Sequence, residues 1–412
     1  MSKINKRKYI NKVKERLPDS WQPKFESFFD FLKHVVYQRW YKIRFIGFFH
    51  FVQYLVKNKI KVATAVKEKR ILGINDFKVT DVAIGNMLEF QVRLLCEAYI
   101  NKVDKIDIAL VYDPVNPVGH WKYTSWMNKD NFHYHLAELF PLLNLSPKLG
   151  SVFIFNSKDD LELFLDQNRS RYFTCPSIFK YANNLGFARD NYRFLRSFYD
   201  KEKFLPQLEL PKIVNLWTKA FVKKNLKGKY MIAVNLRTNP FFAQQRNAIM
   251  ASWKDFFEYC LKKHDNVVFV ILGRKSDVIE AFKELPNVIF TPEHNINIQH
   301  TLSFIKHSLF YMATSSGPAS FAILSEDIAY LIVSFHAPDI SFNYNWWKPG
   351  THLPWQNKEL QKLIWEQETP QILIKEFEDL FNIVAKEKWR KELDLENIDE
   401  SILEWPYLIK GT

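Results

Sequence analysis

The stretch TSSGPAS, residues 314–320, places small hydroxyl side chains, a glycine and a proline between a strand-like run and a helical run. Proline suits the first turn of a helix, so Pro318 predicts that a helix begins there. The mouth of a helix attracts anions, because free N–H groups and the positive end of the helix dipole lie there. An ordinary capped helix would use the same residues. The donors of the predicted diphosphate-sized anion site are the N–H groups of Gly317, Ala319 and Ser320 and the hydroxyls of Ser315 and Ser316.

A second group of candidate residues lies in VNLRTNPFFAQQRNA, residues 234–248. Arg237 stands at the end of a predicted strand, and Arg246 and Asn247 precede the next predicted helix. A guanidinium group at a strand end is a good bidentate partner for phosphate oxygens. Either arginine alone is equally typical of a solvated surface. Two of them around one loop, on the same predicted sheet edge as TSSGPAS, favour a binding role.

The elements that must position these residues alternate regularly from residue 229 onward. The run NVVFVILG is apolar throughout, as expected of a parallel strand that is buried on both faces. Alternating strands and helices predict a doubly wound, Rossmann-like α/β domain, in which ligands bind at the carboxyl ends of the strands. The predicted strands span 229–237, 266–273, 287–291, 308–313 and 329–335, and the predicted helices span 248–263, 277–285, 298–307 and 318–326.

An earlier region shows a similar, weaker alternation. Its predicted strands are 79–85, 105–113, 151–155 and 171–176, with a helix at 86–100. The chain therefore reads as an α/β protein with two Rossmann-like domains that face a cleft. The predicted parts are a basic helical arm at 1–70, an N-terminal domain at 71–205, a linker at 206–228, a C-terminal ligand-binding domain at 229–356 and closing helices at 357–412.

Composition limits the class of protein. The chain has 412 residues, of which 47% are hydrophobic and 25% charged, so it is globular and long enough for two domains. Its three cysteines show no spacing typical of a zinc site or a disulfide framework. The most apolar early run, residues 45–56, is too short to span a bilayer. These features favour a cytoplasmic protein.

The net charge belongs to one segment. Residues 1–70 hold 18 Lys and Arg against 5 Asp and Glu, which equals the +13 of the whole chain. A basic helix with aromatic residues on one face is typical of a segment that lies on an anionic membrane surface. Packing on the protein body and nucleic-acid binding are the alternatives, and no nucleic-acid motif accompanies the charge. The apolar face of this predicted helix consists of Phe28, Leu32, Val36, Trp40, Ile43 and Gly47.

The motifs of the second half together resemble a known family. VNLRTN with a following RN, then VILG, then TSSGPAS, is similar to the nucleotide-sugar-binding half of bacterial GT-B glycosyltransferases, such as heptosyltransferases and fucosyltransferase-like enzymes. The resemblance covers residues 229–335 well and 79–120 loosely. It implies a sugar transfer from a nucleotide-sugar donor to a glycan or lipid-linked acceptor in surface polysaccharide synthesis.

The resemblance also implies roles for individual residues. Arg237, with Arg246 and Asn247 beside it, would neutralise the diphosphate as it leaves. Ser315, Ser316 and Gly317 would hold the same phosphates. The ends of the next two strands would read the base or ribose through Gly273, Arg274 and Glu293. No Asp-x-Asp site follows a strand, so we expect neither a metal nor a separate cofactor.

An inverting transfer needs a general base to accept the proton of the acceptor hydroxyl. We expect the base in the first domain, where Glu89, Asp113 and His120 are the candidates. Asn86 followed by Glu89 also fits a capping box, which would make Glu89 structural. Asp81, inside a predicted apolar strand, reads as a structurally paired carboxylate. The sequence leaves these alternatives open.

We therefore predict an inverting, metal-independent GT-B glycosyltransferase, cytoplasmic and peripheral on the inner face of the membrane. A non-catalytic Rossmann-like nucleotide-binding protein, a nucleic-acid-binding protein that uses the basic arm, and a sugar-nucleotide epimerase are the rival functions.

Overall fold

The computed structural model describes residues 69–80, 82–119, 127–176, 186–240, 244–273, 280–291, 296–335, 350, 352–386 and 393–404. The chain divides into two compact units, Met1–Lys67 and Glu68–Thr412. The predicted arm lies outside the described residues up to residue 68, so its membrane role stays a prediction. Among the described helices, none is both long enough and apolar enough to cross a membrane.

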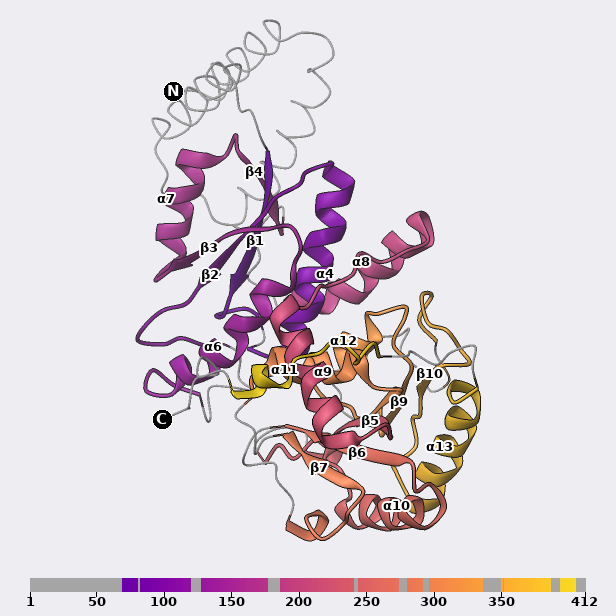
Figure 1. Ribbon diagram of the computed structural model, residues 1–412. Helices are drawn as coiled ribbons and strands as arrows, with labels where there is room; N and C mark the ends of the chain where they lie inside the picture. The colour runs from indigo at the N-terminus through magenta and orange to yellow at the C-terminus, as the bar shows by residue number, and fades with distance from the viewer. Residues whose placement is uncertain are drawn as a thin grey trace, which may run out of the picture. The chain divides into compact units, whose positions relative to one another are not determined.

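The first sheet is parallel, with strand order β3-β2-β1-β4. One of its faces packs against α7, and the other packs against α4 and η2, with α8 lying against α4 (Figure 1). The strands are β1 (Arg70–Asp76), β2 (Ile106–Val111), β3 (Leu149–Phe155) and β4 (Tyr172–Cys175), and the helices are α4 (Ile84–Asn101), α6 (Phe132–Leu139), the 3-10 helix η2 (Phe140–Leu145), α7 (Lys158–Asn168) and α8 (Gly186–Glu202).

The prediction of a strand at 79–85 is wrong. The strand is RILGIND, at 70–76, and α4 begins at Ile84 with Ala83 as its N-cap. The apolar run of β1 directly follows the basic arm in sequence, and the first residue of the strand, Arg70, falls within the predicted arm. Asn86 consequently lies inside α4, so the capping-box interpretation of Asn86 and Glu89 is also wrong. The strands predicted at 105–113, 151–155 and 171–176 are confirmed.

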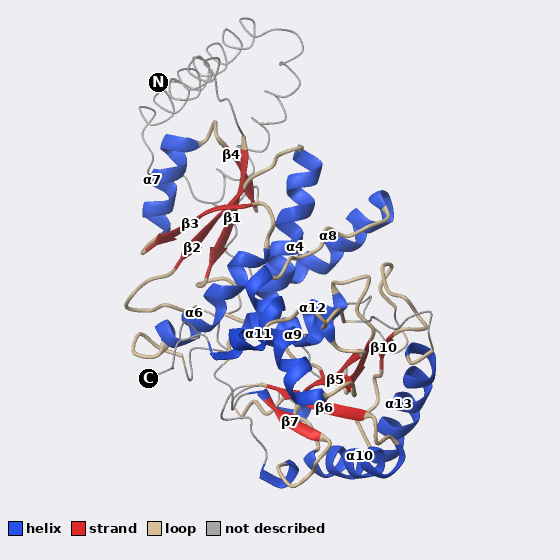
Figure 2. Ribbon diagram, viewed as in Figure 1, coloured by secondary structure: helices blue, strands red, loops and turns tan. Residues whose placement is uncertain are grey.

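The second sheet is also parallel, with strand order β10-β9-β8-β5-β6-β7. Numbered within this half, the order is 3-2-1-4-5-6, that of dinucleotide-binding Rossmann folds. Helices α10 and α13 pack on one face, and α9, α11 and α12 pack on the other (Figure 2). The strands are β5 (Tyr230–Asn235), β6 (Val267–Leu272), β7 (Val288–Phe290), β8 (Phe310–Thr314), β9 (Tyr330–Val333) and β10 (Gln361–Leu363), and the helices are α9 (Lys212–Leu226), α10 (Met250–Lys263), α11 (Ile298–His307), α12 (Ala319–Ile323) and α13 (Pro370–Val384).

Three predictions for this half differ from the structure. Strand β10 falls where only helices were expected, although α13 and the 3-10 helix η9 (Glu400–Glu404) do close the described chain. The helix predicted at 277–285 is reduced among the described residues to the short 3-10 helix η6 (Glu280–Phe282). The linker predicted at 206–228 consists mainly of α9, whose Trp217 and Phe221 pack edge-on against Phe304 of α11.

The two halves share one hydrophobic cluster and meet through polar contacts. Gln299 of α11 donates from Nε2 to the Pro141 carbonyl at 2.7 Å, and the Leu205 amide donates to Glu326 at 2.9 Å. The shared cluster contains residues of both sheets, including Leu88 of α4 and Phe321 of α12. These contacts fix the strand ends of one half relative to those of the other.

His300 makes the stability of this packing depend on pH. Its ring is 3% exposed, lies edge-on to Trp217 at 4.9 Å and contacts Asn297 Oδ1 at 2.9 Å. Burial lowers its pKa from 6.5 to about 4. Between these values the unfolded chain binds a proton that the folded chain does not, so stability falls as the pH falls through this window.

We expect His300→Gln to remove this dependence. Between pH 7 and pH 5 the wild type should lose about 2 kcal/mol more unfolding free energy than the variant. Urea denaturation at the two pH values measures the difference, and other titrating groups cancel between the two proteins. Equal losses in both proteins would contradict the prediction.

Candidate active site at the carboxyl ends of β5 and β8

The order of strands reverses between β5 and β8, and the crevice outside their carboxyl ends is where open α/β sheets bind ligands. Asn235 pairs with Ala313 in the register of the two strands. Arg237 and Thr314 thus leave the sheet side by side, and the Arg237 amide donates to Thr314 Oγ1 at 2.9 Å. The two motifs singled out in the sequence therefore meet at this one point.

Arg246 and Asn247 return to the same point after the loop that follows β5. Arg246 Nη2 donates to the carbonyl oxygen of Ser315 at 2.9 Å and to its Oγ at 2.7 Å. Arg237 Nη1 donates to Asn247 Oδ1, and Asn247 Nδ2 donates to the Asn239 carbonyl at 2.8 Å. These contacts bring Arg237, Arg246, Asn247 and Ser315 together, as the sequence predicted for their positions.

The two guanidinium groups create a concentrated positive charge. Partial burial, and then the charge of Arg246, lower the pKa of Arg237 to about 10. Arg237 still carries its charge near neutral pH, although neighbouring Arg246 disfavours it. Bound phosphate oxygens would relieve this repulsion and supply strong, charge-assisted acceptors.

The observed start of helix α12 differs from the anion-binding helix mouth that the sequence predicts. Helix α12 has five residues. The Ala319 and Ser320 amides donate to the carbonyls of Ser316 and Gly317, each at 3.2 Å. These two amides are therefore engaged within the turn, because the tight turn after Thr314 closes on itself. Anion binding here would depend on guanidinium and hydroxyl groups more than on a helix dipole.

Ser316 and Gly317 have other local roles as well. Ser316 Oγ donates to Asn235 Oδ1 at 2.5 Å, which ties the end of β8 to the end of β5. Gly317 lies against the start of α4, and a Cβ at this position would lie 2.9 Å from Ile84 Cβ. Glycine is thus required by the close approach of the first half to this turn.

The structure describes one of the three residues predicted to read the base. Gly273 follows β6 at the same sheet edge, whereas Arg274 and Glu293 lie outside the described residues. Their role in binding the base remains a prediction.

The candidate bases lie in different surroundings. Glu89 is 8% exposed in α4, and the hydroxyl of Tyr192 in α8 is hydrogen-bonded both to Glu89 and to Ser320 of α12. Burial, followed by the charge of Glu89, raises the pKa of Tyr192 well above its usual value. Glu89 therefore lies near the TSSGPAS turn, but in a buried contact between the two halves.

Asp113 lies two residues after β2 and is accessible. Its Oδ1 accepts from the amides of Val115 at 2.8 Å and Asn116 at 3.2 Å, and its Oδ2 lies 3.4 Å from Lys78 Nζ. These contacts, the Val115 amide first, lower the pKa of Asp113, so it is ionised near neutral pH. His120 and Asp81 lie outside the described residues.

Sequence reasoning missed Asp76, the last residue of β1. The order of the first sheet reverses between β1 and β4, so Asp76 lies at the switch point of this half. It is 8% exposed, accepts from the Lys78 amide at 2.9 Å, and has its pKa raised by burial. The apolar run ILGI before it was the available signal, hidden by the strand assigned at 79–85.

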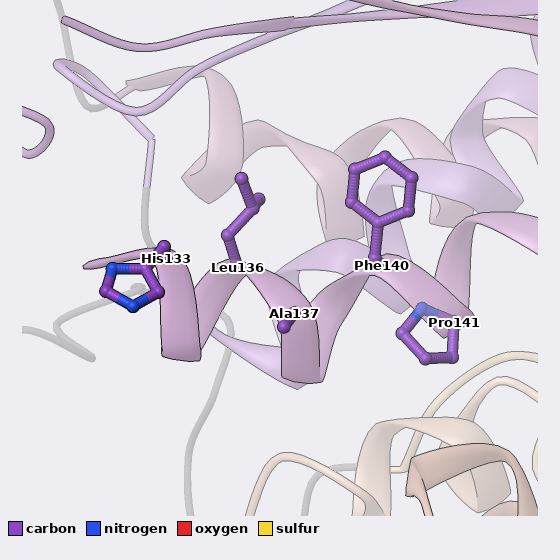
Figure 3. A pocket seen from close by; sticks show the side chains of 5 residues that line it. All are labelled: His133, Leu136, Ala137, Phe140 and Pro141. Carbon is purple, nitrogen blue, oxygen red and sulfur yellow. The ribbon is translucent and has the colours of Figure 1, made fainter. Parts of the chain in front are cut away.

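Neither a metal-binding cluster nor the hollow beside α6 adds a ligand site in the described residues. Among the described residues, no group of three His, Cys, Asp or Glu side chains could hold a metal ion. An open hollow of about 510 Å³ lies along α6 and η2 (Figure 3). Its lining offers few polar groups and does not include the switch-point residues. The lining residues are His133, Leu136, Ala137, Phe140 and Pro141.

Solved structures show the same architecture. A glycosyl transferase family 9 structure from Veillonella parvula superposes with a TM-score of 0.50 at 9% identity, over 78% of this chain and 99% of that chain. The fold is that of a GT-B glycosyltransferase. At this identity the likeness shows the fold alone. No known family model matches the sequence, and neither does any curated protein.

Two further structures are more weakly similar to this GT-B chain. ADP-heptose LPS heptosyltransferase II from E. coli has a TM-score of 0.45 and 13% identity, over 78% of this chain and 99% of that chain. The dodecameric, iron-containing glycosyltransferase TibC from enterotoxigenic E. coli has a TM-score of 0.36 and 11% identity, over 77% of this chain and 76% of that chain.

The close approach at Gly317 gives a prediction. Gly317→Ala should destabilise the protein by about 1–3 kcal/mol, because the new methyl group meets the Cβ of Ile84. Thermal unfolding of the variant and of the wild type measures this loss. An unchanged melting temperature would contradict this account.

Proposed function

We propose that the protein is a glycosyltransferase that moves a sugar from a nucleotide-sugar donor to a glycan or glycolipid acceptor, with inversion and without a metal. The observation that carries the proposal is the pair of guanidinium groups held with Ser315 at the switch point of the second sheet. This half would bind the donor, and the first half would bind the acceptor.

In the proposed reaction the bond from the sugar to the diphosphate breaks, and negative charge develops on the leaving phosphate oxygens. Arg237 would exchange its contact with Asn247 for these oxygens, while Arg246 stays fixed to Ser315. Cationic donors aimed at developing negative charge stabilise the transition state. They would replace the charge that a metal ion supplies in other glycosyltransferases.

The acceptor hydroxyl must lose a proton to a base in the first half. Asp113 is exposed and ionised at a strand end, whereas Glu89 is committed to the contact with Tyr192. Asp76 is the carboxylate at the switch point of the first sheet, and burial raises its pKa. His120 completes the set of candidates by its position in the chain. Asp81 joins them, because in the chain it stands between the end of β1 and the start of α4, and its interpretation as a paired carboxylate rested on the strand wrongly predicted at 79–85.

We further propose that residues 1–70 guide the protein to anionic lipid on the cytoplasmic face of the membrane, where a lipid-linked acceptor would be found. The net charge of +13 in this segment supports the proposal.

Arg237→Ala tests the donor site. Removing a charged donor to phosphate should weaken nucleoside diphosphate binding about 10- to 100-fold, with little effect on unfolding. Thermal-shift titration with ADP, GDP, UDP and CDP measures this, since a ligand of the native state raises the melting temperature. Arg169→Ala is the matched control, because Arg169 is half exposed and, within the part of the chain that the structure describes, pairs with Asp166. Equal affinity in Arg237→Ala and wild type would contradict the site.

Five variants test the base: Asp76→Asn, Asp81→Asn, Glu89→Gln, Asp113→Asn and His120→Gln. Loss of the base should lower kcat about 10²- to 10⁴-fold while donor affinity stays unchanged. Sugar transfer, or donor hydrolysis where the acceptor is unknown, gives the rate. If none of the five variants lowers kcat while donor affinity is kept, the base lies elsewhere.

A further inference from the structure

A buried glutamate from a distant part of the chain contacts the segments that frame the candidate donor site. Glu368 lies between β10 and α13, directly before Thr369, the N-cap of α13. It is 1% exposed, and a buried polar side chain is stable only where hydrogen bonds satisfy it. Among the described residues its carboxylate is held by neutral donors, one on each oxygen.

The first donor is the backbone amide of Ile249, which gives a hydrogen bond to Glu368 Oε1 at 2.8 Å. Ile249 is the N-cap of α10, and it follows Asn247 by two residues. The residue between them, Ala248, donates its amide to the Arg237 carbonyl at 2.9 Å. Glu368 therefore fixes the point from which the Arg246–Asn247 pair extends to Arg237 and Ser315.

The second donor is Ser334, whose hydroxyl donates a hydrogen bond to Glu368 Oε2. The same hydroxyl oxygen accepts a hydrogen bond from the Glu368 amide at 3.2 Å. Ser334 follows β9 and has a φ of 48°, a left-handed conformation that is unfavourable for a residue other than glycine. Thr314 pairs with Val333 in the sheet, so Ser334 leaves β9 beside the point where Ser315 leaves β8. The carboxylate holds this bend in place.

Glu368 thus joins the segment that leads to Arg246 with the strand end beside Ser315, and Arg246 and Ser315 contact each other at 2.7 Å. We propose that Glu368 is a positioning residue for the donor diphosphate, acting through Ile249 and Ser334 to set the geometry of the Arg246–Ser315 contact. The inference rests on the proposed function, and no contact of Glu368 with the donor is part of it.

Glu368→Ala tests the inference in the full-length protein. We expect the affinity for the nucleoside diphosphate that binds the wild type best to fall at least 10-fold, measured at a temperature where all variants are folded. Peptides that span residues 244–252 should exchange amide hydrogens faster, because the Ile249 amide loses its acceptor. Ser334→Ala, which removes one of the two contacts, should show an intermediate loss of affinity.

Leu380→Ala is the matched control for a general loss of stability. Leu380 is 0% exposed in α13 and belongs to a hydrophobic cluster of the same half that includes neither Ile249 nor Ser334, so its truncation leaves a cavity in that cluster. It should lower the melting temperature while nucleotide affinity stays within 2-fold of wild type. A similar loss of affinity in Leu380→Ala and Glu368→Ala would overturn the positioning role.

Glu368→Gln tests whether the hydrogen bond that Glu368 accepts from Ile249 is what maintains nucleotide affinity. Its amide oxygen can still accept from Ile249, so most of the affinity should return, to within about 3-fold of wild type. Unchanged affinity in Glu368→Ala, with tight binding by the wild type, would overturn this inference alone. Absence of nucleoside diphosphate binding by the wild type would overturn the proposed function and this inference together.

Discussion

Two guanidinium groups, those of Arg237 and Arg246, lie at one edge of the second sheet, and the contacts around them offset burial and their mutual repulsion. Two guanidinium groups at one sheet edge, one of them partly buried, are unfavourable unless the surrounding contacts hold them. Asn247 and Thr314 fix Arg237, and Ser315 fixes Arg246. The reversal of strand order between β5 and β8 provides the space in which these groups meet. An anionic ligand is the natural complement to such an arrangement.

One of the contacts between the two halves is made by the turn that carries Ser315. Gly317 lies against Ile84 at the start of α4, and Ser320 is joined through Tyr192 to Glu89. Helix α4 follows the loop after β1, where Asp76 lies. The turn predicted to bind the nucleotide sugar therefore contacts α4, which belongs to the half predicted to bind the acceptor.

Much of the second half could be predicted from sequence because its strands are continuous apolar runs and its charged residues stand just past strand ends. Arg237, Arg246 and Ser315 were grouped correctly on that basis. The position of β1 was missed because its apolar run borders the basic arm. Glu368 gave no local signal, since its contact with Ile249 joins residues 119 positions apart. The amides of Ala319 and Ser320 donate hydrogen bonds within the turn because the turn closes tightly. No residue pattern in the sequence specifies that closure.

The most direct test of the account is a crystal structure of the protein with the nucleoside diphosphate that stabilises it best. The account predicts the diphosphate between Arg237 and the Thr314–Gly317 turn, with the Arg237 guanidinium moved from Asn247 to phosphate oxygens. A nucleotide bound elsewhere, or an Arg237 side chain that remains on Asn247 with the ligand present, would contradict it.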